Sequence, residues 1–518
     1  MSAEAVAGNV DLALRAFLLV SREHVILVRA IAVLFVPWIC WRCWMFIVYP
    51  LLHPQNPRQL PYWIPIVGHG FAFFKNSPAV LGRADEHFGG SKELYSLCLF
   101  GETIYVVTDP RHTVEVYKNT KNLTFEEFVI GILKQTGMSK AGIQSVYNPL
   151  PETKPGFPNP NGDPLSVLVR QIHMHQAYPG ENLDILDSHF VAWFDGHFRF
   201  PAIQKTCATY AFPRGESELQ VPLWKFCSEI QVQAAGECYF GDTLSKILYQ
   251  YPSFLTGKLN AALKKMQRAL QKYFEIPQSQ RRGQLWQVNT MEDELRAIGV
   301  LEKDIGILFF NIFWGINTNS RKTAFWILSY LLHHPSEMDA VREETANAFR
   351  GDQLVHLEYL YEQCPRLNNI WHETLRVYSH AVSARSIKKD TVIGGKLLRE
   401  GRRVMIPFRM LHMDESVWGD DVGAFRPARF AGKTAELTKS PSWRPFGGGK
   451  SLCSGRYVAK HLTFMFTAMA LRRFDMARVG DGPFPEGDIG KPALGMMSIK
   501  KDQDYTIRLS ARQDEAVH

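Results

Sequence analysis

The residues best suited to chemistry lie in one glycine-rich stretch near the carboxyl end of the chain, Phe446–Arg456. Three consecutive glycines let the backbone take positive φ angles and approach a flat ligand closely. Cys453 follows them and precedes a segment with apolar residues at helical spacing, so unpaired N–H groups and the helix dipole favour its thiolate. Thiolate is the form that ligates iron, and the pattern predicts a haem-thiolate site. A lone cysteine after a glycine turn is also typical of a small buried hydrophobic residue.

The stretch resembles the cysteine-ligand signature of the cytochrome P-450 superfamily. The matching positions are Phe446, Gly449, Cys453, Gly455 and Ala459. The resemblance implies haem b, with its iron bound axially by the Cys453 thiolate, which in that family favours O–O cleavage. One position departs from the signature. Ser451, beside Lys450, stands where relatives carry an Arg or His that holds a haem propionate.

Glu373 and Arg376 stand three residues apart in a helical pattern, so they share one face of the helix. An exposed pair at this spacing is common and contributes only a few tenths of a kcal/mol. In the family, however, an E-x-x-R pair is joined by a later arginine in a buried network that braces the cysteine loop, and Arg429 matches that arginine. By the same resemblance, Arg385 matches a strand arginine that pairs with a haem propionate and compensates for Ser451.

A proline-rich stretch, residues 141–164, predicts a loop that covers a channel to the site. The expected helix after this loop lacks the W-x-x-x-R of relatives. It offers Arg170, His173 or His175 as further propionate partners.

Polar residues interrupt an apolar helical stretch at Asn317, Thr318 and Asn319. In the family this region carries an acid and a threonine that relay protons, and these three residues are the candidate catalytic positions. When the family pattern is aligned on Phe325 and Trp326, Asn319 stands at the position of the family's threonine. This register resembles the subgroup of sterol hydroxylases, prostacyclin synthase and their fungal relatives. Alternatively, these side chains only bond to carbonyls one helical turn earlier.

Composition and length agree with a large globular enzyme. Hydrophobic residues make up 46% of the 518 positions, and the eight cysteines are dispersed as in a reducing compartment. The net charge of +8 is spread among acidic residues without a long basic run, which argues against a nucleic-acid partner. We predict a mainly α fold with a small β-region, the cytochrome P-450 fold. Residues 71–518 would form one catalytic domain, with a hairpin at 94–108 and further strands at 382–405.

An apolar stretch at residues 30–52 is long enough to span a membrane, although Pro37 and Arg42 interrupt it. We predict an anchor at residues 1–53 and a stiff proline-rich hinge at 54–70. An interfacial helix and a buried core helix are the alternatives. By resemblance to microsomal relatives, the protein would sit in the endoplasmic reticulum membrane with its catalytic domain facing the cytosol.

The predicted function is insertion of one oxygen atom of dioxygen into a lipophilic small molecule, in the biosynthesis of a secondary metabolite. The chain has no dinucleotide-binding signature, so electrons must come from a separate NADPH-cytochrome P-450 reductase, with cytochrome b5 as a further donor. Cations around the loop would attract that acidic partner, or serve only solubility. They are Lys433, Lys439, Arg444, Lys450, Arg456 and Lys460. A reductase-independent isomerase or dehydratase is the alternative function, and a non-catalytic haem sensor is a third.

Overall fold

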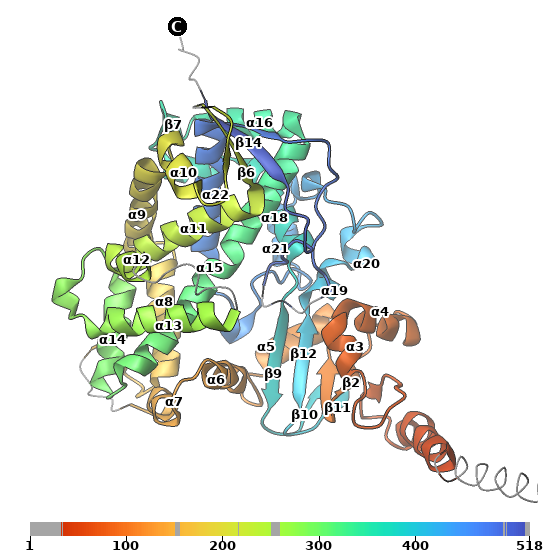
Figure 1. The fold of residues 1–518 in the computed structure, drawn as a ribbon. Helices are drawn as coiled ribbons and strands as arrows, with labels where there is room; N and C mark the ends of the chain where they lie inside the picture. The colour runs from red at the N-terminus through yellow and green to blue at the C-terminus, as the bar shows by residue number, and fades with distance from the viewer. Residues whose placement is uncertain are drawn as a thin grey trace, which may run out of the picture.

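The computed structural model describes residues 33, 35–150, 156–215, 217–249, 259–490, 493 and 495–512. Within these residues helices predominate, and a twisted sheet lies at one side of the helical body (Figure 1). The predicted fold class, mainly α with a small β-region, is confirmed. The beginning of the predicted anchor and residues 151–155 of the predicted loop fall outside the described residues.

The helices follow one another with short connections. Their bounds are α2 Tyr49–Leu52, α3 Gly70–Lys75, α4 Ser77–His87, α5 Pro110–Lys118, α6 Glu126–Gln135, α7 Lys140–Tyr147, α8 Leu165–Ala177, α9 Glu181–His197, α10 Phe200–Cys207, α11 Leu223–Phe240, α12 Asp242–Tyr249, α13 Leu259–Glu275, α14 Trp286–Ala297, α15 Glu302–His333, α16 Pro335–Ala346, α17 Leu357–Glu362, α18 Pro365–Tyr378, α19 Phe408–His412, α20 Glu415–Trp418, α21 Thr434–Lys439 and α22 Arg456–Arg473.

The 32-residue helix α15 runs through the helical body and packs against α11, α13 and α22 (Figure 1). Its apolar side chains, among them Phe309, Phe325 and Trp326, are fully buried in the main hydrophobic core. At Gly306 an added Cβ would lie 2.9 Å from the backbone nitrogen of Gln271 in α13. The absence of a side chain at this position therefore lets the two helices approach closely.

The main sheet of the described chain has the strand order β1-β2-β3-β12-β9-β4. Its strands are β1 Arg58–Gln59, β2 Tyr95–Leu99, β3 Glu102–Val106, β4 Leu123–Thr124, β9 Val382–Ile387 and β12 Arg403–Pro407. A second sheet has four strands, β5 Phe212–Pro213, β6 Glu218–Pro222, β13 Phe474–Arg478 and β14 Thr506–Ala511. Two small hairpins complete the described strands. One pairs β7 Phe349–Arg350 with β8 Gln353–Leu354, and the other pairs β10 Thr391–Ile393 with β11 Lys396–Leu398. The predicted hairpin at 94–108 and the predicted strands at 382–405 are thereby confirmed.

One part of the predicted loop is wrong, because α7 occupies Lys140–Tyr147 at its start. The prolines of this stretch begin only at Pro149, so nothing before them interrupts a helix. Ser139 caps the helix by accepting a hydrogen bond from the backbone N–H of Gly142 at 2.9 Å. Asp304 of α15 accepts the backbone N–H of Ser139 at 2.9 Å, so the cap is attached to the helical core.

The apolar segment Phe35–Leu52 is helical, long enough to cross a membrane, and has no buried residue within the described chain. Arg42, the charge that interrupts it, donates a hydrogen bond to the carbonyl of Tyr62 and lies over the rings of Trp38 and Trp63. The guanidinium group is thus held against the proline-rich segment. That segment joins the main sheet at β1, which pairs in parallel with β2.

Candidate active site

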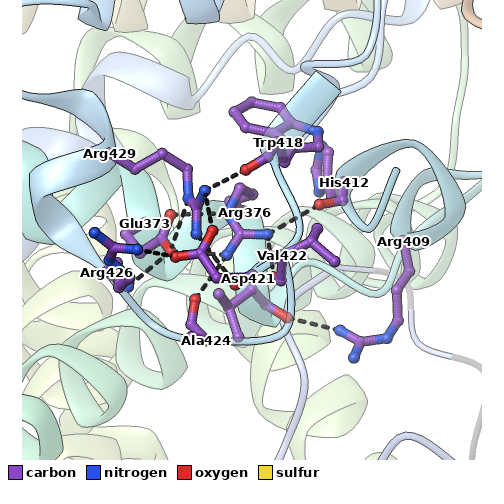
Figure 2. A network of polar contacts seen from close by, with 11 residues as sticks. Glu373, Arg376, Arg409, His412, Trp418, Asp421, Val422, Ala424, Arg426 and Arg429 are labelled. Atoms are coloured by element: carbon purple, nitrogen blue, oxygen red, sulfur yellow. Dashed lines mark hydrogen bonds and ion pairs between the residues drawn. The ribbon is translucent and has the colours of Figure 1, made fainter. Parts of the chain in front are cut away.

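A buried network of polar contacts centres on Glu373 and Arg376 of α18 (Figure 2). Both side chains are fully buried, and Arg376 binds the carboxylate bidentately, with Nε to Oε2 at 2.8 Å and Nη2 to Oε1 at 2.7 Å. The remaining donors of Arg376 bind backbone carbonyls of His412, Val422 and Ala424. Each of its five N–H donors therefore has an acceptor, which is the condition for burying a guanidinium group without a large loss of stability.

Arg429 joins this network from the short 3-10 helix Pro427–Phe430. Its Nε lies 3.5 Å from Oε1 of Glu373, and its Nη1 lies 2.9 Å from Oδ1 of Asp421. Its guanidinium group also donates to the carbonyl of Trp418. The structure thus brings together the three residues that the sequence pattern predicts as a unit (Figure 2).

His412 connects the network to the glycine-rich stretch. Its carbonyl accepts Arg376, and its ring Nε2 accepts the backbone N–H of Arg444 at 3.0 Å. Burial, together with the nearby positive charges of Arg376 and Arg409, lowers the pKa of His412 to about 3, so the ring is neutral and able to accept. The sequence analysis missed this residue, because no motif surrounds it.

The glycine-rich stretch forms a tight loop in front of α22. The N–H of Cys453 donates to the carbonyl of Phe446 at 3.0 Å, which closes the loop, and Gly455 precedes the first residue of α22. Gly449 has a φ of 58°, in the left-handed region. At Gly448 an added Cβ would lie 2.8 Å from the ring of Tyr117 in α5. The predicted need for glycine in this loop has a specific physical cause at each of these two positions.

Cys453 is exposed, although enough protein surrounds it for burial to raise the pKa of its thiol. The backbone N–H of Gly455 and the charge of Arg456 oppose this rise. The backbone N–H at the start of α22 and the charge of Arg456 therefore stabilise a thiolate at this position. An accessible cysteine in a glycine cradle fits a flat, iron-bearing cofactor.

The family model of cytochrome P-450 matches residues 226–502, slightly more than half of the chain. The chain belongs to the cytochrome P-450 family. A cytochrome P-450 monooxygenase, poxD, of Penicillium oxalicum is 24% identical over 89% of this chain and 94% of its own length. A second one, nodJ, of Hypoxylon pulicicidum is 22% identical over 88% of this chain and 90% of its own length. Secologanin synthase 1 of Catharanthus roseus is 33% identical over 29% of this chain and 28% of its own length.

The protein is accordingly an oxidoreductase of the cytochrome P-450 monooxygenase type. Members of this family use a cysteine-ligated haem. Because Cys453 lies inside the matched region, in an accessible position at the start of a helix, the residues present fit this group. Bound there, a thiolate-ligated haem supplies activation of dioxygen.

Arg385 of β9 reaches the loop of this cytochrome P-450 from the main sheet. Its Nη2 donates to the hydroxyl of Ser451, and its Nη1 donates to the hydroxyl of Ser383 at 2.9 Å. The guanidinium carbon also lies 5.3 Å from the ring centre of Tyr117. Arg385 therefore occupies the side of the loop where the family's usual cation is missing.

The structure separates the three polar candidates of the distal helix α15. Asn317 and Thr318 donate to the carbonyls of Phe313 and Trp314, one turn earlier, at 2.9 and 2.6 Å. Both residues therefore make the local carbonyl bonds of the alternative interpretation, and their catalytic role stays a prediction. Asn319 differs, because its Oδ1 accepts the backbone N–H of Met496 at 3.0 Å.

Asn319 is one of three side chains on the same face of α15 that bind the turn at residues 495–497. Lys322 donates to the carbonyl of Met496 at 2.9 Å, and Trp326 donates to the carbonyl of Met497 at 3.1 Å. Burial, and then the neighbouring charge of Arg321, lowers the pKa of Lys322 to about 8. The sequence analysis missed the lysine. Its only sequence signal is its spacing of three and four residues from Asn319 and Trp326.

Two of the three propionate candidates on α8 have partners on α14. The ring of His173 lies 2.6 Å from the amide nitrogen of Gln287, and the ring of His175 packs edge to face against Trp286. Through these contacts, His173 and His175 pack α8 against α14. Arg170 has a buried Nε without a partner in the described chain.

Proposed function

We propose that this chain hydroxylates or otherwise oxygenates a lipophilic small molecule of secondary metabolism, using haem b held by Cys453. One oxygen atom of dioxygen enters the substrate, and the other takes up two protons and two electrons and leaves as water. The observation that carries the proposal is the accessible Cys453 thiol at the start of α22, in a loop connected through His412 to the buried Glu373–Arg376 pair. The monooxygenase names of the fungal relatives support the reaction type.

In this proposal the residues of the chain have separate tasks. Cys453 binds the metal, while Phe446, Gly449 and Gly455 shape the loop that presents it. Glu373, Arg376 and Arg429 hold the loop in place, and Asn319 keeps α15 at a fixed position relative to the turn at 495–497. Residues 71–518 form the catalytic domain, with residues 1–53 as the anchor and 54–70 as the hinge.

Electrons come from a separate NADPH-cytochrome P-450 reductase, with cytochrome b5 as a further donor. Exposed cations near the loop, Lys433, Lys439 and Lys450, support docking of an acidic partner. Arg444 does not belong to this surface, because burial lowers the pKa of its guanidinium group. Arg456 packs over the rings of Tyr178 and Tyr457, and only part of its charge faces outward.

We also propose attachment to the endoplasmic reticulum membrane, with the catalytic domain in the cytosol. Besides the unburied helix Phe35–Leu52, a group of large apolar side chains is exposed on the segment that follows it. Trp63, Ile66 and Phe71 are each at least 70% exposed. Such side chains favour the boundary between headgroups and acyl chains. In a membrane fraction, protease should degrade the catalytic domain without detergent, and its protection would contradict the orientation.

The function is tested with the full chain carrying haem. Reduced protein under carbon monoxide should show the spectrum of a sulfur-ligated haem, and Cys453→Ser should abolish that spectrum. Cys364→Ala, which changes a buried cysteine far from the loop in sequence, serves as the matched control. Retention of the sulfur-ligated spectrum by Cys453→Ser would refute the assignment.

Turnover distinguishes the oxygenase from an isomerase or dehydratase. Product formation from a panel of lipophiles should require NADPH, reductase and dioxygen, and the oxygen atom in the product should derive from labelled dioxygen. Conversion of a hydroperoxide without these three components would favour the reductase-independent alternative.

A further inference from the structure

Two guanidinium groups beside the cysteine loop, that of the buried Arg385 and that of the half-buried Arg444, have no acidic partner within the described chain. Arg385 donates only to uncharged groups, the hydroxyls of Ser383 and Ser451 and the carbonyl of Ala384. Arg444 donates to the carbonyl of Trp443 at 2.9 Å, and its Nε is buried with no hydrogen-bond partner. Within the described part of the chain, neither of them forms an ion pair.

Burial lowers the pKa of both Arg385 and Arg444, which means that water solvates their charges poorly. A buried cation without a counter-charge costs several kcal/mol of stability. Two such cations beside one loop therefore make this region a strong binding site for a group with two negative charges.

A third polar group, the hydroxyl of Tyr117, lies near both cations. The ring of Tyr117 lies under the guanidinium group of Arg385, and the charges of Arg385 and Arg444 both act on its hydroxyl. This side chain is 9% exposed, and its buried hydroxyl makes no hydrogen bond of normal geometry within the described chain, although the Ser383 hydroxyl is near enough to lower its pKa. Burial raises the pKa of Tyr117, so the phenol stays protonated and is available as a donor.

All three groups are attached to the loop that carries Cys453. The ring of Tyr117 contacts Gly448 and Gly449, where an added Cβ would lie 2.8 and 3.2 Å from its side chain. Arg385 binds Ser451, two residues before the cysteine, and Arg444 precedes Phe446, whose carbonyl binds the cysteine N–H. The cations are therefore positioned relative to the same loop that presents the sulfur.

We propose that Arg444 and the hydroxyl of Tyr117 bind the propionate carboxylates of haem beside Arg385, with Arg444 supplying a second cation next to the strand arginine that the family resemblance already implies. The proposal rests on haem ligation by Cys453. Two guanidinium groups balance two carboxylates, and the Tyr117 hydroxyl adds a neutral donor. Charge-assisted hydrogen bonds of this kind are among the strongest that proteins make.

The test compares two porphyrins in the full-length protein. One is natural haem, and the other is its dimethyl ester, in which both carboxylates are uncharged. Each is loaded into wild type and into Arg444→Gln, and the rate of haem transfer to excess apomyoglobin is followed by absorbance. We expect Arg444→Gln to release natural haem about tenfold to a hundredfold faster, as follows from the loss of one charged hydrogen bond. Release of the dimethyl ester should change less than about twofold, well below the tenfold that corresponds to 1.4 kcal/mol.

Arg444→Lys keeps the charge and should fall between wild type and Arg444→Gln. Lys450→Gln, which removes an exposed cation of the same loop, should leave both release rates unchanged. Equal acceleration for the two porphyrins would mean that Arg444 acts only on the fold, and no acceleration for natural haem would mean that it binds nothing. Either result overturns the proposal. Failure of haem ligation itself would differ from both, because wild type would then lack the sulfur-ligated spectrum.

Discussion

Two clusters of arginines contact the segment that leads to Cys453, and they satisfy their charges differently. Arg376 has Glu373 and three carbonyls as partners, so each of its donors is bound by the protein itself (Figure 2). Arg385 and Arg444 have only neutral partners in the described chain. The first cluster is complete within the folded chain, whereas the second has a positive charge for which the protein provides no counter-charge.

This difference separates structural from binding arginines by physical criteria. Removing one member of a complete pair leaves an unpaired buried charge and destabilises the fold. Removing a member of the incomplete cluster relieves an unpaired charge, and the penalty is expected only when the anionic ligand is bound. The two clusters should therefore respond to mutation with opposite signs in the haem-free protein, and four predictions follow this contrast from the largest effect to the smallest.

The largest effect is expected for Glu373→Ala, which leaves Arg376 buried without its carboxylate. We expect a loss of about 3–5 kcal/mol in the free energy of unfolding, enough to prevent accumulation of haem-loaded protein. Urea denaturation followed by circular dichroism measures the free energy of unfolding, and the haem content per chain measures how much haem-loaded protein accumulates.

The matched control for this prediction is Arg426→Ala. The side chain of Arg426 is 63% exposed and pairs with Asp421 at the edge of the same network. Its removal should change the stability by less than about 1 kcal/mol, because exposed ion pairs contribute little. Similar losses in the two variants would contradict the view that burial of the Glu373–Arg376 pair makes it structural.

The second prediction concerns acid. The pKa of His412 is about 3 in the folded chain, because of burial and the charges of Arg376 and Arg409, with Arg444 acting in the same direction. The ordinary value is 6.5, so between these two pH values the unfolded chain binds a proton that the native chain excludes. Stability should therefore fall as the pH decreases through this window, by at most about 1.4 kcal/mol per pH unit from this one site.

The pH dependence can be assigned to His412 by substitution. His412→Asn should reduce the slope of the unfolding free energy against pH, while His87→Asn, at an exposed position on α4, should leave it unchanged. His173 and His372, whose pKa values burial lowers to about 4, contribute to the part that remains, as do His69, His333 and His380, whose pKa values burial also lowers. An identical slope in wild type and His412→Asn would show that this ring is not the link between the network and the loop.

The third prediction tests a contact that involves no charge pair. At Gly495 an added Cβ would lie 2.1 Å from Oδ1 of Asn319. Gly495→Ala should therefore destabilise the protein by about 1–3 kcal/mol through overpacking, and Asn319→Ala should relieve that loss in the double variant. Additive effects of the two substitutions, measured in a double-mutant cycle, would show that the two residues do not touch.

The sequence predicts the whole cluster around Arg376 but only part of the cluster formed by Arg385 and Arg444. Glu373, Arg376 and Arg429 stand in patterns with characteristic spacing, and the contacts of Figure 2 join them as expected. Arg385 was also found by its position in a strand. Arg444 was grouped with exposed docking cations, because a single arginine next to a proline carries no sign of burial.

The contacts missed from the sequence share one cause. His412, Tyr117 and Lys322 act through partners that are distant in the chain, such as Arg444, Gly448 and Met496. Spacing patterns report neighbours on one helix or strand, so they do not identify a residue that meets its partner only after the chain has folded. Asn319 was chosen by alignment with relatives, but its contact with Met496 could be seen only in the folded structure.

The smallest effect is expected for Tyr117→Phe, and its sign distinguishes the two clusters. The Tyr117 hydroxyl is buried and makes no hydrogen bond of normal geometry within the described chain, so its removal should leave the haem-free protein unchanged or stabilise it by up to about 1 kcal/mol. Loss of one neutral donor to a carboxylate should nevertheless speed release of natural haem by roughly threefold to tenfold.

Tyr105→Phe is the matched control for that substitution. Tyr105 is also buried, but its hydroxyl accepts hydrogen bonds from Arg402 at 2.9 Å and from the backbone N–H of Arg399 at 3.3 Å. Its removal should cost about 1 kcal/mol and leave haem release unchanged, because these donors lose a protein partner. If Tyr117→Phe destabilised the haem-free chain as much as Tyr105→Phe, the Tyr117 hydroxyl would have a protein partner after all. The cluster around the cysteine loop would then be complete in itself, like the one around Arg376, and would have no need of a ligand.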